Sequence, residues 1–162
     1  MTLADIENHV MYGKFPCRLP VWRGHYGEIG AHPNIPKISG KKVVLRIEKR
    51  FNRFERLLAK LFKAPREVRR PLDEKNSLLW QLADGTRKFE EICSILDSVF
   101  NEDISPVIDR TFAGINLLKS KNLMTVLNEP YNGKWNVKKG IIPVNQELQD
   151  LDPSLGIIVE EE

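Results

Sequence analysis

The segment from Pro71 to Arg87, PLDEKNSLLWQLADGTR, constrains the fold of this chain more than any other part. Asp73 stands where its carboxylate can accept hydrogen bonds from the free N–H groups of a first helical turn. The apolar residues of 78–82 supply a buried face, and Gly85 can take the left-handed conformation that ends a helix. The segment contains no nucleophile, metal-ligand or phosphate-binding pattern. It therefore predicts a short helix in a scaffold that works by binding.

Apolar spacing predicts further helices on both sides of this segment. Residues 51–63 carry six apolar side chains on one face of a helix and Arg or Lys on the other. A second helix is expected from about Lys88 to Phe100, with Thr86 as its cap. Ser105-Pro106 opens a third, because proline suits the first helical position, where no donor is needed.

Short runs of β-prone residues predict the strands. Ile35–Ile38 and Val43–Ile47 flank a Ser-Gly turn and suggest a hairpin. Arg66–Leu72 is expected to form a third strand and Met124–Leu127 a short closing strand.

These elements indicate an α+β fold with a winged-helix-like core. A small antiparallel sheet of about three strands is expected to pack on a three-helix bundle, with an extra amphipathic helix. Residues 1–33, rich in Gly and Pro, are expected to be an irregular N-terminal extension. Residues 34–128 would form the domain, with 51–63 as a helical insert, and residues 129–162 an acidic tail.

The net charge of +3 conceals a strong asymmetry. Residues 41–70 carry twelve Lys or Arg against three Glu, whereas residues 143–162 carry six acidic residues and no basic one. This pattern suggests an acidic partner for the middle of the chain, pairing with its own tail, or simply a solvated basic face. The chain has no apolar run long enough for a membrane span, no signal-peptide pattern, and only two distant cysteines, so a cytoplasmic location is expected.

The middle of the chain, most specifically residues 65–123, resembles the PqqD-like family, small peptide-binding modules also called RiPP recognition elements. The resemblance is carried by Pro71-Leu72-Asp73-Glu74, Leu79-Trp80-Gln81-Leu82-Ala83-Asp84-Gly85, Phe89-Glu90-Glu91-Ile92 and Asn122-Leu123. It covers roughly residues 42–127, and 51–63 resembles an insert of a longer PqqD-like subgroup. The first forty and last thirty residues have no counterpart in it.

The resemblance implies a peptide-binding adaptor. Family members hold the leader segment of a ribosomally made precursor peptide while a modifying enzyme, often a radical-SAM enzyme, acts on the other end. The leader adds as a strand beside the third strand and packs against the third helix, which is strand augmentation. The corresponding elements here are Arg66–Leu72 and Pro106–Leu123. The candidate peptide-binding residues are therefore Val68, Arg69, Arg70, Arg110, Thr111 and Asn116.

Each of these assignments has a plainer interpretation. Arg69 and Arg70 also suit the protection of an exposed edge strand against aggregation. The apolar face of 51–63 is expected to pack on the domain, with a membrane surface or an anionic partner as the alternatives. Because proline removes a strand donor, a proline at Val68 is expected to abolish peptide binding more than it harms folding.

A winged-helix DNA-binding protein, such as a transcription regulator, is the alternative function. The helix-turn-helix outline and the basic middle fit it. The first turns of the third helix, Ser105–Arg110, offer only one acid and one base to base edges, which disfavours nucleic acid. Neither catalysis nor a cofactor nor a metal site is expected. The three histidines match no ligand spacing, and Cys17 with a following histidine lacks an orienting third group.

Overall fold

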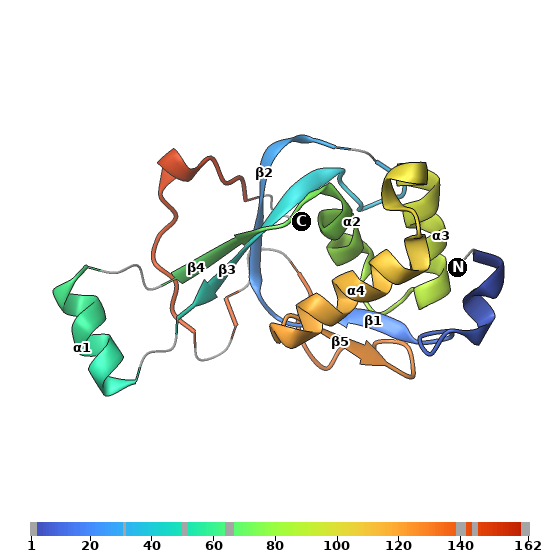
Figure 1. Cartoon of the computed structure of the whole chain (residues 1–162). Coiled ribbons are helices and arrows are strands. Elements are labelled where there is room, and N and C mark those ends of the chain that lie inside the picture. Colours follow the sequence, from blue (N-terminus) through green and yellow to red (C-terminus); the bar gives the residue numbers. More distant parts are fainter. Residues whose placement is uncertain are drawn as a thin grey trace.

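A computed structural model describes residues 3–30, 32–49, 52–63, 67–138, 142–143 and 146–159 and shows an α+β fold (Figure 1). Two small antiparallel sheets, ordered β2-β3-β4 and β1-β5, support the helices. The elements in chain order are η1 (Leu3–Asn8), β1 (Phe15–Arg18), β2 (Trp22–Ile29), β3 (Lys41–Glu48), α1 (Arg53–Leu61), β4 (Glu67–Pro71), α2 (Glu74–Leu82), α3 (Phe89–Phe100), η2 (Asn101–Ile104), α4 (Val107–Ser120), β5 (Met124–Leu127) and η3 (Pro153–Leu155).

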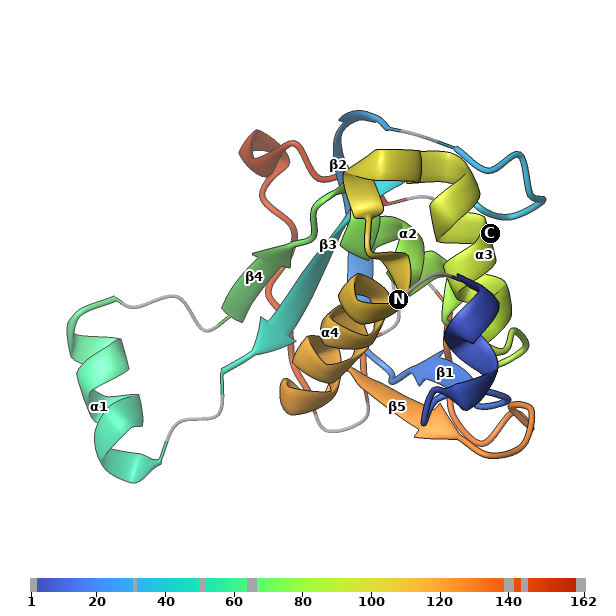
Figure 2. The same cartoon turned by 45° about the vertical axis from the view of Figure 1, so that its right-hand side comes forward.

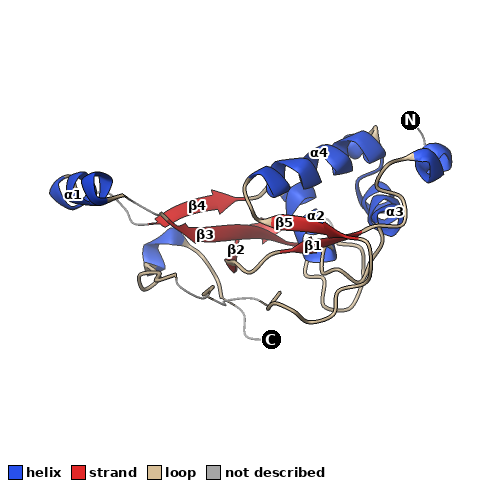
Figure 3. Ribbon diagram, turned by 90° about the horizontal axis from the view of Figure 1, so that it is seen from below, coloured by secondary structure: helices blue, strands red, loops and turns tan. Residues whose placement is uncertain are grey.

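The central strand of the larger sheet is β3, which pairs antiparallel with β2 on one side and β4 on the other. Its four middle residues, 43–46, are all buried. Seen from below, α4 lies on one side of the strands and the C-terminal segment on the other (Figure 3). Both faces of β3 are therefore covered. This explains why its middle residues are all buried and do not alternate between buried and exposed.

The smaller sheet joins segments from opposite ends of the chain, since Phe15 pairs with Leu127. The other edge of β1 lies against the turn between α2 and α3: Arg18 N–H donates to the Ala83 carbonyl (2.8 Å) and Gly85 N–H to the Pro16 carbonyl (3.1 Å). This turn therefore ties the helices to β1.

Helices α2, α3 and α4 enclose the core. Asp73 is the N-cap of α2, and its Oδ1 accepts from the Asn76 amide at 2.7 Å, as expected from the sequence. Every residue from Ser77 to Leu82 is buried, and Trp80 is only 1% exposed. The largest buried side chains of the other two helices pack around it and include Phe89, Ile92, Leu96, Ile108 and Ile115.

Several local expectations were wrong. Residues 1–33 are not irregular, because they contain β1 and β2 after a short helix. No strand forms over Ile35–Ile38, so β3 pairs with β2 and β4 and not with a hairpin partner there. The N-cap of α3 is Lys88, not Thr86, whose hydroxyl instead donates to Asp84 Oδ1 at 2.6 Å.

Helix α1 confirms the amphipathic helix expected within 51–63, but its apolar face does not pack on the domain. The helix lies within the β3–β4 connection and stands apart from the rest of the domain (Figures 1 and 2). None of its residues is buried. No helix in the described part of the chain is long and apolar enough to cross a membrane.

The acidic C-terminal region is held against the sheet by specific contacts. The backbones of His25 and Ile158 form an antiparallel bridge at the free edge of β2. Trp135 Nε1 donates to the Arg18 carbonyl (2.9 Å), and the Arg46 guanidinium donates to the Gln149 carbonyl (2.6 Å). This region therefore completes the face of the sheet opposite α4.

Candidate functional site

A groove of about 350 Å³ lies between α2 and α4, and α3 and η2 each contribute one residue to its lining. Its apolar lining comes from all four elements and consists of Leu79, Leu96, Ile104, Ala113 and Leu117. The polar lining groups are Asp73, Lys75, Asn76, Arg110 and Thr111. An apolar groove with a few polar side chains at its rim suits the side chains of a bound ligand.

Strand β4 is the edge strand of its sheet and leads directly to this groove. It pairs with β3 alone, and no other segment among the described residues pairs with it. Only Leu72 lies between its last residue, Pro71, and the groove residue Asp73, which directly precedes α2. Figure 3 shows β4 as the strand of its sheet on the side where α4 lies. The C-terminal end of the open edge strand thus leads into the apolar groove.

The side chains of β4 alternate between two surroundings, because successive residues of a strand point to opposite faces. Val68 and Arg70 are half-buried and lie opposite Ile47 and Leu45, on the face that packs on the helices. Arg69 instead lies opposite Arg46, on the face covered by the C-terminal segment. The three sequence candidates on β4 are therefore divided: Val68 and Arg70 face the groove side and Arg69 does not.

On the face of β4 covered by the C-terminal segment, ion pairs fix the orientation of the strand. The Glu67 carboxylate pairs with the buried Arg46 at 2.7 Å and with Arg69 at 3.1 Å. The Ser154 amide, and to a smaller extent the Arg69 guanidinium, lower the pKa of Asp152. Arg69 thus serves the contact between β4 and the C-terminal segment.

The backbone of Arg69, unlike its side chain, is well placed for a partner strand. Leu72 N–H donates to the Val43 carbonyl at 2.8 Å, so Leu72 belongs to the hydrogen-bonded pairs of the β3–β4 ladder. Such pairs alternate along an antiparallel ladder. Val68 therefore directs its N–H toward β3, whereas Arg69 directs its N–H to the open edge. Proline at Val68 would therefore remove a hydrogen bond of the sheet itself, so a test of edge pairing belongs at Arg69.

Of the three candidates on α4, two line the groove. Arg110 is exposed at the rim and donates to the Asp103 carbonyl at 3.2 Å. Thr111 belongs to the lining but is only 2% exposed, and its hydroxyl interacts with the buried Cys93 thiol, whose pKa is raised by burial and lowered in part by this contact. Asn116 is exposed and is not part of the lining.

Sequence reasoning missed Leu117, an apolar groove residue that is 54% exposed. Leu117 directly precedes Leu118, a buried residue of α4, and does not itself fall at the helical spacing of the core residues. An apolar residue next to the core stripe was the available signal. Lys75 and Asn76, in the first turn of α2, were also missed, because nothing local indicates that this turn faces α4.

A second cavity, of about 560 Å³, lies between the C-terminal segment, β1, β2 and the α2–α3 turn. It is strongly cationic, with Arg18, Arg23, Lys37, Arg87 and Lys138 in its lining. Two of these side chains hold the fold together through hydrogen bonds or an ion pair. Arg18 donates to three backbone carbonyls, those of Trp80, Gln81 and Val137, and Arg87 pairs with Asp84 at 3.1 Å.

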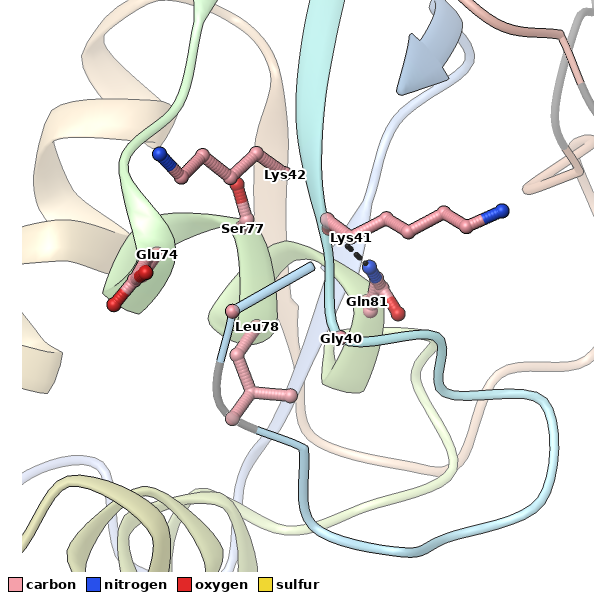
Figure 4. A pocket seen from close by; sticks show the side chains of 8 residues that line it. Gly40, Lys41, Lys42, Glu74, Ser77, Leu78 and Gln81 are labelled. Atoms are coloured by element: carbon pink, nitrogen blue, oxygen red, sulfur yellow. Dashed lines mark hydrogen bonds between the residues drawn. The ribbon is translucent and has the colours of Figure 1, made fainter. Parts of the chain in front are cut away.

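A much smaller crevice, of about 10 Å³, separates the start of β3 from α2 (Figure 4). Gln81 spans it, donating from Nε2 to the Lys41 carbonyl (3.1 Å) and accepting from the Ser39 amide (2.8 Å). Space of this size holds about one water. The crevice is therefore part of the packing of α2 on the sheet.

The potentially reactive side chains are dispersed. Cys17 and Cys93 are free and fully buried, and burial raises the pKa of their thiols to about 11 and about 12. His9 stacks on Phe89 with ring centres 5.1 Å apart. Within the described ranges no three His, Cys, Asp or Glu side chains gather as a metal site.

Comparisons of the chain with family models, curated proteins and solved structures find no match. The PqqD-like resemblance and the winged-helix-like arrangement therefore stay predictions.

Proposed function

We propose that this protein is a peptide-binding adaptor that holds an extended segment of another chain along β4. The observation that carries the proposal is the open edge of β4 next to the groove between α2 and α4. The added strand would form backbone hydrogen bonds with Glu67 and Arg69, the residues whose polar groups point outward. Alternate side chains of the peptide would enter the groove, giving selectivity.

The polar groups of the groove favour an acidic or amphipathic peptide. Lys75 and Arg110 stand at its rim against Asp73, and the half-buried Arg70 lies on the same side of β4. By the PqqD-like resemblance, the ligand is the leader of a ribosomally made precursor, presented to a modifying enzyme of the radical-SAM or another type.

The decisive variant is Arg69→Pro. Proline removes the outward N–H but no bond of the β3–β4 ladder, and edge strands tolerate it in this orientation. Arg69→Ala is the matched control, because it removes the same side chain and retains the N–H. Val68→Pro is the contrasting variant, which should lower the stability of the fold.

The probe is a displayed library of linear peptides, from which binders to the full chain are selected and their Kd values measured. Arg69→Pro should weaken the selected binders at least tenfold, and Arg69→Ala only slightly. Amide shifts on binding should concentrate in β4 and α4. Absence of any enriched binder, or equal affinities for the two variants, would refute the proposal.

Duplex DNA is the control ligand for the alternative function. Val107 and Ile108, in the first turn of α4, are buried, and Asp109 and Arg110 are the exposed residues there. Salt-dependent binding of duplex DNA that Arg69→Pro leaves unchanged would favour the DNA-binding alternative.

A further inference from the structure

Helix α1 is formed by local interactions and not by packing on the domain. Asn52 and Glu55 form a capping box, with Glu55 N–H donating to Asn52 Oδ1 at 2.7 Å and Asn52 N–H to Glu55 Oε2 at 3.2 Å. None of its residues is buried, and it stands apart from the core (Figures 1 and 2). Isolated helices of nine residues are marginal in water. A surface that covers its apolar face would therefore stabilise it.

That apolar face is long and unusually exposed. The side chains at positions 54, 57, 58, 61 and 62 recur at spacings of three and four, so they form one stripe. Phe54, Leu61 and Phe62 are 69%, 72% and 74% exposed. Leu57 is 64% exposed and Leu58 is 36% exposed. In water this stripe costs free energy roughly in proportion to its area.

The opposite face of α1 is basic. Arg53, Arg56 and Lys60 lie on it, Lys63 follows just after the C-cap, and all four are exposed. Glu55 is the one acidic residue between 52 and 63, and it is engaged in the capping box. The helix therefore combines an aromatic and leucine-rich stripe with positive charge.

We propose that α1 docks this protein on an anionic lipid surface. A helix with a basic polar face and Phe and Leu opposite lies in the membrane interface, its apolar side among the acyl chains. Anionic headgroups supply the charge that complements the four basic residues. A nine-residue helix is about 14 Å long, too short to bury the roughly 800 Å² per partner of a stable protein interface. A bilayer needs no such area or shape complementarity.

The position of α1 allows the rest of the protein to remain in water. It lies within the β3–β4 connection, well apart from α2 and α4 (Figure 2), between which the groove lies. The proposal is thus independent of peptide binding.

The test is co-sedimentation of the full chain with vesicles. One set is phosphatidylcholine alone, and in the other a third of the lipid is phosphatidylserine. Binding should require phosphatidylserine and weaken with salt. The charge variant is Arg56→Gln with Lys60→Gln, and the apolar variant is Phe54→Ser with Phe62→Ser. Each neutralised charge should weaken binding about fivefold, and the apolar variant should weaken it at least tenfold.

Matched controls carry the same changes elsewhere on the surface. Lys119→Gln with Lys121→Gln alters two exposed charges at the C-terminal end of α4, and Val10→Ser with Ile142→Ser alters two exposed apolar residues. Both should retain vesicle binding. Thermal unfolding of all variants should match that of the parent, because the altered residues are exposed.

Two outcomes would overturn the proposal. One is failure to bind phosphatidylserine vesicles, or binding that the α1 variants leave unchanged. The other is the absence of vesicle binding together with a dimer in analytical ultracentrifugation. If the apolar variant, Phe54→Ser with Phe62→Ser, dissociates that dimer, the stripe binds a second copy of the chain. Neither outcome bears on the peptide-binding test with Arg69→Pro.

Discussion

The backbones of His25 in β2 and Ile158 near the C-terminus exchange two hydrogen bonds of 2.8 Å each. This bridge covers one edge of the three-stranded sheet with the protein's own chain, while the edge at β4 has no partner among the described residues. Exposed strand edges invite association, so proteins usually protect them. The contrast between the two edges is what makes β4 the candidate for a foreign strand.

Ile158→Pro should open the β2 edge, because it removes the N–H that donates to His25. We expect a loss of about 1 kcal/mol, faster amide exchange at His25, and concentration-dependent association through the uncovered edge. Val159→Pro is the control, since its N–H makes no backbone hydrogen bond within the described ranges. Equal exchange at His25 in the two variants would show that the bridge does not protect the edge.

Gly85→Ala should be strongly destabilising, because Gly85 has a φ of +81° and its missing Cβ would collide with Tyr131 and the Cys17 sulfur. Gly133 is the matched control, with a φ of +85° and open space around it. Gly133→Ala should cost about 1 kcal/mol from conformation alone, and Gly85→Ala about 2–4 kcal/mol. Urea unfolding measures both. Similar losses would mean that the close approach of β1 to this turn is easily relaxed.

The Asp-Gly turn also shows what the sequence could predict. The Asp73 cap, the burial of Trp80 and the turn after α2 follow from local patterns, and the structure confirms them. From the local sequence alone, the Asp-Gly pair predicts only that the helix ends there. In the structure, Gly85 also admits β1 and the C-terminal segment, which are far away in the chain.

The strands of residues 1–33 were missed for a related reason. In β2, Gly24 appeared to indicate a loop, yet a Cβ there would lie 2.7 Å from Ile157 Cγ2, so glycine is needed for the packing of the C-terminal segment. In β1 all four residues are buried, so there is no alternation to detect. For the candidate site, the sequence indicated the strand and the helix. It could not indicate that Arg69 would face the C-terminal segment, because that depends on register.

Stability should fall at alkaline pH because of the buried thiols. Burial raises the pKa of Cys17 from 9.0 to about 11, and that of Cys93 to about 12, with the Thr111 hydroxyl opposing part of the second rise. Burial also raises the pKa of Tyr26. Above pH 9 the unfolded chain releases these thiol protons while the folded chain keeps them, so the unfolded state binds fewer protons and the free energy of unfolding decreases.

The stabilisation is thus complete below pH 9 and is lost as the pH rises toward about 11 for Cys17 and about 12 for Cys93. Each thiol should contribute a slope of about 1.4 kcal/mol per pH unit in this range. Urea unfolding at successive pH values measures the slope. Cys93→Ala should lower the absolute stability at every pH and reduce the slope by the share of one thiol. A slope that Cys93→Ala leaves unchanged would mean that the Cys93 thiol titrates in the folded protein as it does in the unfolded chain.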